Sequence, residues 1–250
     1  MPIIIFILFV ALLPVVVLLY YIYKKDRYQR EPASQMLLAF ACGIGATFLS
    51  LAFTMPFSVA GVDASAGQSV FGAIARAFYL AALPEETAKL IILWFFLRSC
   101  SYFDEHMDGI VYAVCVSLGF AALENVVYLF ANYPDIIGVG ISRSLFAVPG
   151  HFFFGVLMGY YYSLAKYSKV DKLYYMILTL LAPVLAHGCY DSLLFVMTVS
   201  PSLSIILTIL FLYFCHKLRK YCSSKIEEHL NRDRVRNYKQ KHSEVDGIEK

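Results

Sequence analysis

Two adjacent glutamates and a lysine stand in the middle of an apolar stretch of this sequence. Glu85, Glu86 and Lys89 lie within residues 69–97, a stretch long enough to cross a bilayer. A charged side chain at the centre of such a segment costs at least about 2.5–3.5 kcal/mol on the insertion scale. We therefore expect the three groups to be compensated by one another or by polar residues elsewhere. Ionisable residues inside a membrane segment indicate a functional site.

Four further ionisable residues that suit hydrolytic chemistry lie well inside other apolar segments of the chain. These residues are Glu124, His151, His187 and Asp191. His187 and Asp191 are four residues apart, as are Glu85 and Lys89, so each pair shares one face of a helix. The sequence therefore predicts two pairs of neighbouring polar side chains within the membrane.

The acidic pair on 69–97 could activate a water molecule for hydrolysis. Either Glu85 or Glu86 could serve as the general base, and Lys89 would neutralise one of the two carboxylates. An idle pair of carboxylates at mid-membrane depth is too costly to be a good alternative.

The two intramembrane histidines allow two kinds of site. His151 and His187 could bind a divalent metal such as zinc, with Glu124 or Asp191 completing the ligand set. Alternatively, no metal is needed and the histidines stabilise an oxyanion directly. Asp191 could orient His187 in either case. The chain has no His-Glu-x-x-His motif, so a zincin-type site is not supported.

The composition excludes an ordinary soluble domain. Hydrophobic residues make up 60% of the chain and charged residues 16%, with a mean hydropathy of +0.65. The six cysteines form no Cys-x-x-Cys pair, so neither a disulfide framework nor a thiolate metal site is supported. We expect the lipid bilayer as a partner and no nucleic acid.

The chain divides into about seven apolar segments of membrane-spanning length. They cover residues 3–23, 35–60, 70–97, 108–131, 140–165, 173–197 and 201–218. Lysine and arginine gather in alternate loops and after the last segment, so the N-terminus is expected outside and the C-terminus in the cytoplasm. The predicted fold is an all-α polytopic membrane bundle over 1–218, followed by a charged cytoplasmic tail over 219–250.

The seven candidate site residues occur on four consecutive segments, from 70–97 to 173–197. With a helical rise of about 1.5 Å per residue, they fall in one layer between the midplane and the outer face. Pro84 is expected to free the carbonyl near Leu80 and to kink the helix at this layer.

Other polar and aromatic residues have simpler interpretations. Arg76 and Arg143 lie near outer ends, where they either reach the membrane surface or contact a substrate. The aromatic clusters 152–154 and 160–162 are expected to face lipid or the membrane interface.

Three motifs in order carry a resemblance to a known family. They are Glu85-Glu86-x-x-Lys89, Phe120-x-x-x-Glu124 and His187-x-x-x-Asp191. The sequence resembles the PrsW family of intramembrane proteases, within the wider group of CAAX-processing and bacteriocin-processing membrane proteases. The resemblance covers about residues 20–200, including the stretch 26–32, and Glu124 and Asp191 favour the PrsW branch.

This resemblance implies an intramembrane endopeptidase in a bacterial plasma membrane. Its implied partner is a single-span membrane protein, and its implied reaction is site-1 cleavage of an anti-sigma factor. Because family members are classed both as metalloproteases and as glutamate-type enzymes, the resemblance leaves open whether a metal is present. A proton- or cation-coupled transporter is the alternative. Against it, no inverted repeat is visible, and the polar groups lie in one layer rather than in a line across the membrane.

Overall fold

The fold is helical throughout the part of the chain that the structure describes. This computed structural model covers residues 2–61 and 69–248, so most of the outer loop expected over 61–69 lies outside the described residues. The longer helices are α1 (Pro2–Lys25), α2 (Ala33–Val59), α4 (Val70–Arg76), α5 (Leu83–Leu97), α6 (His106–Ala131), α7 (Ile136–Ser142), α8 (Val148–Tyr167), α9 (Lys172–Val199) and α10 (Ser204–Ile248).

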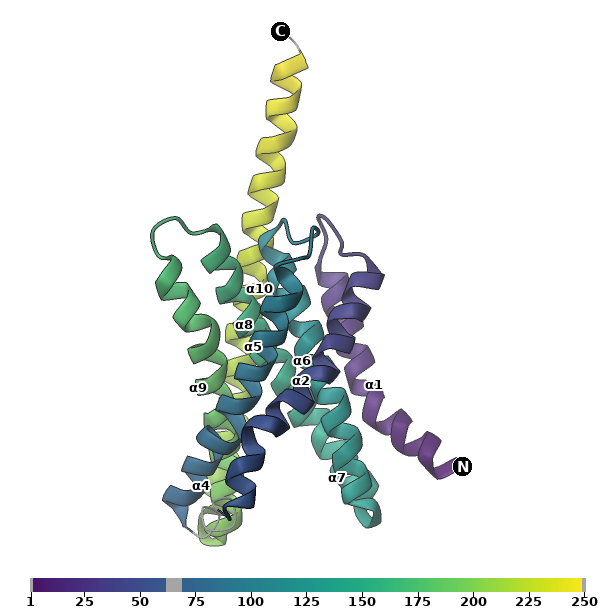
Figure 1. Ribbon diagram of the computed structural model, residues 1–250, viewed down its shortest axis with the longest axis vertical. Helices are drawn as coiled ribbons and strands as arrows, with labels where there is room; N and C mark the ends of the chain where they lie inside the picture. The colour runs from purple at the N-terminus through teal and green to yellow at the C-terminus, as the bar shows by residue number, and fades with distance from the viewer. Residues whose placement is uncertain (1, 62–68, 249–250) are drawn as a thin grey trace.

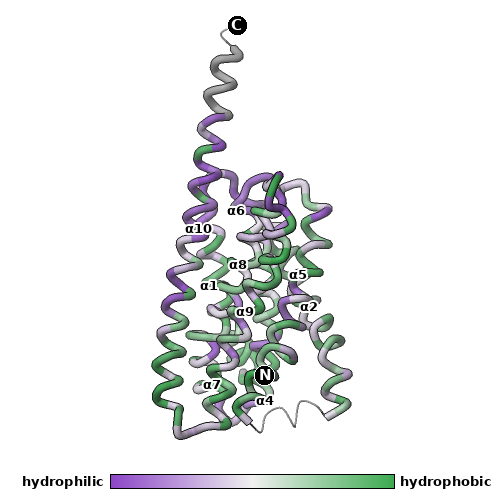
Figure 2. The backbone as a smooth tube through the Cα atoms, turned by 90° about the vertical axis from the view of Figure 1, so that its left-hand side faces the viewer, coloured by the Kyte–Doolittle hydropathy of each residue, from purple (hydrophilic) through white to green (hydrophobic). Residues whose placement is uncertain are grey.

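The helices form the predicted polytopic bundle. Among the described residues, 6 helical stretches are long and apolar enough to cross a membrane. The stretch from α4 to α5 also runs along the bundle, although its interruption and its charged residues set it apart (Figure 1). The turns after α1, α5 and α8 lie at the end where α10 protrudes (Figure 1), and hydrophilic residues gather at that end (Figure 2). This arrangement agrees with a cytoplasmic C-terminus.

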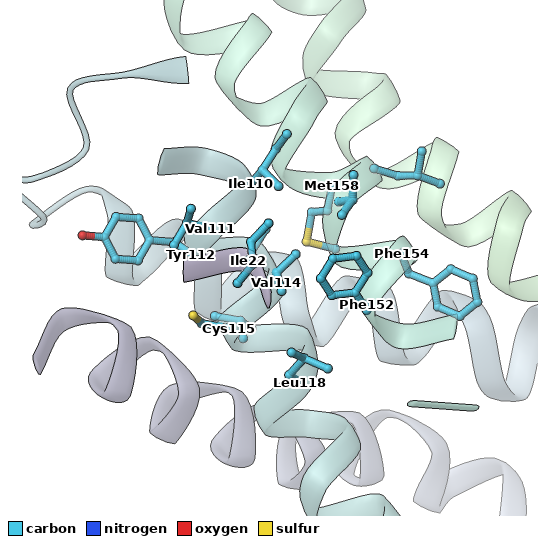
Figure 3. Packing of buried hydrophobic residues seen from close by; sticks show 14 of the residues in the cluster. Ile22, Ile110, Val111, Tyr112, Val114, Cys115, Leu118, Phe152, Phe154 and Met158 are labelled. Carbon is cyan, nitrogen blue, oxygen red and sulfur yellow. The ribbon is translucent and has the colours of Figure 1, made fainter. Parts of the chain in front are cut away.

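Helices α6 and α8 form the centre of the bundle. Their buried apolar side chains, including Ile110, Val114, Leu118 and Met158, pack together in one cluster (Figure 3). A Cβ atom added at Gly159 would lie 2.2 Å from the Gly109 carbonyl oxygen, so only glycine permits this close approach of the two helices. The position of α8 relative to α6 is therefore fixed by small residues.

The expectation that both aromatic clusters face lipid is wrong for several members. Phe152, Phe154 and Tyr160 are almost fully buried. The reason is that α8 packs against α1, α6, α9 and α10, so few of its residues reach the surface. Phe154 instead belongs to the wall of the site described below.

Two helices change to a wider π-helical turn just before a proline. The segment Ala77–Ala82 (η1) precedes Pro84, and Arg143–Ala147 (η3) precedes Pro149. A proline lacks an N–H and its ring collides with the carbonyl four residues earlier, so the backbone widens there. The predicted irregularity near Leu80 is thus confirmed, and a second one precedes His151.

The last helix passes residue 218 without a break. Helix α10 continues to Ile248 rather than ending where the polar tail was expected to begin. Beyond that point Asp233 is buried and accepts hydrogen bonds from the backbone N–H groups of His106, at 2.9 Å, and Met107, at 2.8 Å. The first part of the charged tail is therefore packed against the start of α6.

Candidate active site

Helix α5 places a lysine between two carboxylates in the middle of the bundle. The Lys89 Nζ atom lies 2.7 Å from Glu86 Oε1 and 3.4 Å from Glu85 Oε2. It also lies 4.1 Å from the centre of the Phe120 ring. Lys89 and Glu86 are fully buried, so each charge is compensated by the other and not by water. The sequence-based pairing of Lys89 with the acidic pair is confirmed.

Helix α9 brings a histidine to the same carboxylates. His187 Nδ1 lies 2.9 Å from Glu86 Oε1, and His187 Nε2 lies 3.2 Å from Asp191 Oδ2. The ring stacks on Phe154 with 4.6 Å between ring centres. Both nitrogens thus face carboxylates, and Asp191 and Phe154 fix the orientation of the ring.

Helices α6 and α8 supply the next pair of the polar layer. His151 Nε2 lies 2.8 Å from Glu124 Oε2, and His151 Nδ1 lies 3.1 Å from Lys89 Nζ. Because a lysine ammonium can only donate, Nδ1 is the acceptor and the ring proton is on Nε2, directed at Glu124. Both nitrogens of His151 are therefore engaged, one by Glu124 and the other by Lys89.

An arginine and an asparagine extend this network beyond the residues singled out from the sequence. Arg143 Nη2 donates to Glu124 Oε2 at 2.8 Å, and Arg143 Nε donates to Asn125 Oδ1 at 2.6 Å. Asn125 in turn donates to the Ala11 carbonyl oxygen at 2.8 Å. Arg143 was expected at the membrane surface or on a substrate, whereas the structure directs it at Glu124. Asn125 was not predicted as a site residue, and only its position next to Glu124 in the sequence could have indicated it.

A cavity of about 270 Å³ opens beside this network. Glu85 lines the cavity with 16% of its side chain exposed, whereas Glu86 is fully buried behind it. Its apolar walls include Phe146, Phe195 and Phe211. On the cytoplasmic side of the polar layer, the buried cluster of Figure 3 fills the space between α6 and α8. The site residues thus border a pocket on the outer side of an apolar floor.

One group of three potential metal ligands occurs among the described residues. Glu85, Glu86 and His187 can each place one ligand atom within 4.8 Å of the others. Glu86 Oε2 is buried and has no hydrogen-bond partner, which leaves it available to an ion. Two carboxylates and one imidazole suit a divalent metal such as zinc, so these three residues fit such an ion. The ligand set predicted from the sequence shares only His187 with this group, and the roles of Glu124, His151 and Asp191 as ligands stay a prediction.

A multi-helix membrane bundle with glutamates and histidines around a buried pocket has the architecture of an intramembrane hydrolase. The chain belongs to the PrsW family: the family model, described as PrsW family intramembrane metalloprotease, matches residues 31–216. The chain is accordingly an intramembrane protease and a multi-pass bacterial membrane protein.

Three relatives named Protease PrsW illustrate the similarity. The protein of Geobacillus kaustophilus is 40% identical over 181 residues, which are 72% of this chain and 76% of the relative. That of Clostridioides difficile is 32% identical over 224 residues, 88% of this chain and 90% of the relative. That of Bacillus subtilis is 37% identical over 187 residues, 72% of this chain and 79% of the relative. No solved structure matches the chain.

Proposed function

We propose that this protease cleaves a single-span membrane protein in the outer half of the bilayer, with Glu85 as the general base. The observation that carries the assignment is the contrast between two adjacent glutamates. Glu85 reaches the cavity, whereas Glu86 is fully buried against Lys89 and His187. Only a carboxylate that borders the pocket can take a proton from a water molecule placed against a substrate.

Hydrolysis then follows from the positions of these side chains. Glu85 takes a proton from water as the oxygen bonds to the peptide carbonyl carbon, which gives a tetrahedral oxyanion. When the C–N bond breaks, Glu85 returns the proton to the departing amine. Lys89 keeps Glu86 ionised and in place, and Asp191 holds the His187 ring. Glu86 and His187 would hold a divalent metal, which when bound supplies a Lewis acid for the carbonyl oxygen, while Glu85, the third group of this cluster, stays the base.

The anti-sigma-factor type of substrate comes from the family resemblance. The aromatic walls of the cavity support a substrate with apolar residues around the cut bond, as a membrane segment has. The apolar cluster packed between α6 and α8 argues against the transporter alternative, because it leaves no room for an ion path between these two helices.

The first experiment compares three purified variants on single-span substrates in liposomes. Glu85→Gln should lose cleavage by at least about a hundredfold, the usual contribution of a general base. Glu86→Gln and His187→Ala should lose cleavage and also bound metal, measured by elemental mass spectrometry. Glu227→Gln, at an exposed carboxylate of α10, is the matched control. Cleavage by Glu85→Gln at the wild-type rate would remove Glu85 from this role.

The substrate class needs a separate experiment in cells. Membrane proteomics of a strain that carries Glu85→Gln in place of the wild-type chain should reveal a single-span protein that accumulates uncut. Accumulation of an anti-sigma factor would support the proposed cascade. Accumulation of unrelated membrane proteins alone would contradict that substrate and leave the peptidase chemistry intact.

A further inference from the structure

A second hollow lies in the cytoplasmic half of the bundle, away from the active site. It is a groove of about 530 Å³ between α5, α8 and α9. Leu90, Ile91 and Trp94 of α5 form one wall, and Met176 of α9 belongs to the other. The groove lies along the part of α5 that follows Lys89 toward the cytoplasmic end. We call it the inner groove.

The inner groove exists because the start of α9 stands apart from α5. The turn between α8 and α9 lies at the edge of the bundle in Figure 1. Met176 is 54% exposed, whereas Thr179, one turn later, is buried at 3%. The lining of the groove is therefore more exposed at the start of α9 than one turn further along this helix. At this depth its apolar walls face hydrocarbon, so an acyl chain fits them better than water does.

Three lysines lie at the cytoplasmic mouth of the groove, where the carboxylates of Asp104 and Asp108 also act on Lys166. Lys166 and Lys172 belong to its lining, and Lys169 lies in the turn that joins α8 to α9. Asp171 is the one acidic residue of that turn. Lys166 uses one donor on the Phe103 carbonyl oxygen and lies 3.5 Å from the centre of the Phe103 ring.

Two of these three lysines are not committed to an acidic partner. Lys169 and Lys172 are exposed and form no ion pair with any residue that the structure describes. A cluster of lysines at the cytoplasmic surface attracts anionic lipid, and basic pockets between membrane helices on this side bind lipid phosphates. The apolar groove and its charged mouth thus match the two parts of one amphipathic molecule.

We propose that the inner groove binds an anionic glycerophospholipid of the cytoplasmic leaflet. One acyl chain lies between Trp94 and Met176, and the phosphate is held by Lys166 and Lys172. Because the groove borders α5 directly after Lys89, a bound lipid supports the helix that carries both catalytic glutamates. Lipid binding at this place is separate from the hydrolytic step.

The test uses the full chain in nanodiscs that contain phosphatidylglycerol and phosphatidylcholine with identical acyl chains. After transfer to detergent, native mass spectrometry counts the lipids that stay bound, and titration with each lipid gives its affinity. The wild type should retain phosphatidylglycerol in preference to phosphatidylcholine. Lys172→Gln should lower the affinity for phosphatidylglycerol about fivefold, the effect expected for one juxtamembrane lysine. Lys172→Arg should keep the preference for phosphatidylglycerol. Met176→Trp should lower the affinity for both lipids, because the larger side chain fills the groove.

Lys217→Gln is the matched control, because this exposed lysine of α10 lies outside the groove. Equal retention of both lipids by the wild type would overturn the proposal, as would the same loss in Lys172→Gln and Lys217→Gln. Displacement of bound phosphatidylglycerol by a single-span substrate peptide would also overturn it, since the groove would then be a substrate site. Lys172 is exposed, so its replacement tests binding without disturbing the fold.

Discussion

His187 Nδ1 lies 2.9 Å from Glu86 Oε1, although the two residues are 101 positions apart in the sequence and belong to different helices. Glu86 also receives the Lys89 ammonium at 2.7 Å, so this one buried carboxylate joins α5 to α9. The contact between Glu86 and His187 is the centre of the site, because the pocket-facing Glu85 and the ring-holding Asp191 are arranged around it.

Removal of Lys89 should leave Glu86 as an uncompensated buried charge. Lys89→Met is expected to destabilise the protein by about 3–5 kcal/mol, as breaking a buried ion pair does. Thermal unfolding in detergent measures the change. In the double variant Glu86→Gln/Lys89→Met the orphaned charge is absent, so part of the stability should return. Equal unfolding temperatures for the single and double variants would show that the two side chains are not coupled.

Arg143 is expected to act through Glu124 and His151 rather than on the substrate. Arg143→Gln removes the donor to Glu124, so His151 loses its fixed orientation and cleavage should fall about 10–100-fold. Arg143→Lys should recover only part, since lysine cannot reach both Glu124 and Asn125. Kinetics on a single-span substrate measure the effect, and Arg219→Gln on exposed α10 is the control. A change in KM alone, with kcat unaltered, would instead indicate a substrate contact.

Two glycines of α2 offer a matched test of helix packing. A Cβ atom at Gly43 would lie 2.0 Å from the Val116 carbonyl oxygen, whereas one at Gly45 would meet nothing within 4 Å. Gly43→Ala must push α2 away from α6 and should destabilise by roughly 1–3 kcal/mol, the range for overpacking. Gly45→Ala should be neutral or slightly stabilising. Unfolding temperatures that fall equally in both variants would contradict this packing.

The cytoplasmic end carries a buried carboxylate that should make stability depend on pH. Burial raises the pKa of Glu31 from 4.5 to about 9; the Tyr112 hydrogen bond opposes this rise and the Asp108 charge adds to it. Between pH 4.5 and about 9, Glu31 is ionised in the unfolded chain and protonated in the folded chain. The free energy of unfolding therefore decreases as the pH rises through this range.

Glu31→Gln should therefore flatten the fall in unfolding temperature between about pH 5 and pH 9. Glu31→Ala serves as the comparison, because it removes the carboxylate to which the Tyr112 hydroxyl donates and should destabilise at every pH. Burial also raises the pKa of Asp26 to about 7. A weaker dependence of the unfolding temperature on pH should therefore remain in both variants. An unchanged slope in Glu31→Gln would show that Glu31 is ionised in the folded state.

The packed part of the charged tail should contribute to stability. Asp233→Ala removes the acceptor of the His106 and Met107 N–H groups at the start of α6, with an expected loss of about 0.5–2 kcal/mol. Arg234→Ala, at the exposed neighbouring position, should change little. Chemical unfolding in detergent compares the two variants. Truncation after residue 218 should lower stability further, and a truncated protein as stable as the full chain would show that the tail does not hold α6.

The sequence by itself determined the all-α membrane bundle and the pairing of Lys89 with the acidic pair, while the orientation of the helices in the bilayer and the depth of the polar layer stay predictions. Hydropathy and helical rise are local properties, so they can be predicted along the chain. Adjacent residues on a helix point about 100° apart, and only packing decides which of them faces a pocket. The tertiary structure therefore decided that Glu85 borders the cavity while Glu86 is buried, and that Arg143 reaches Glu124.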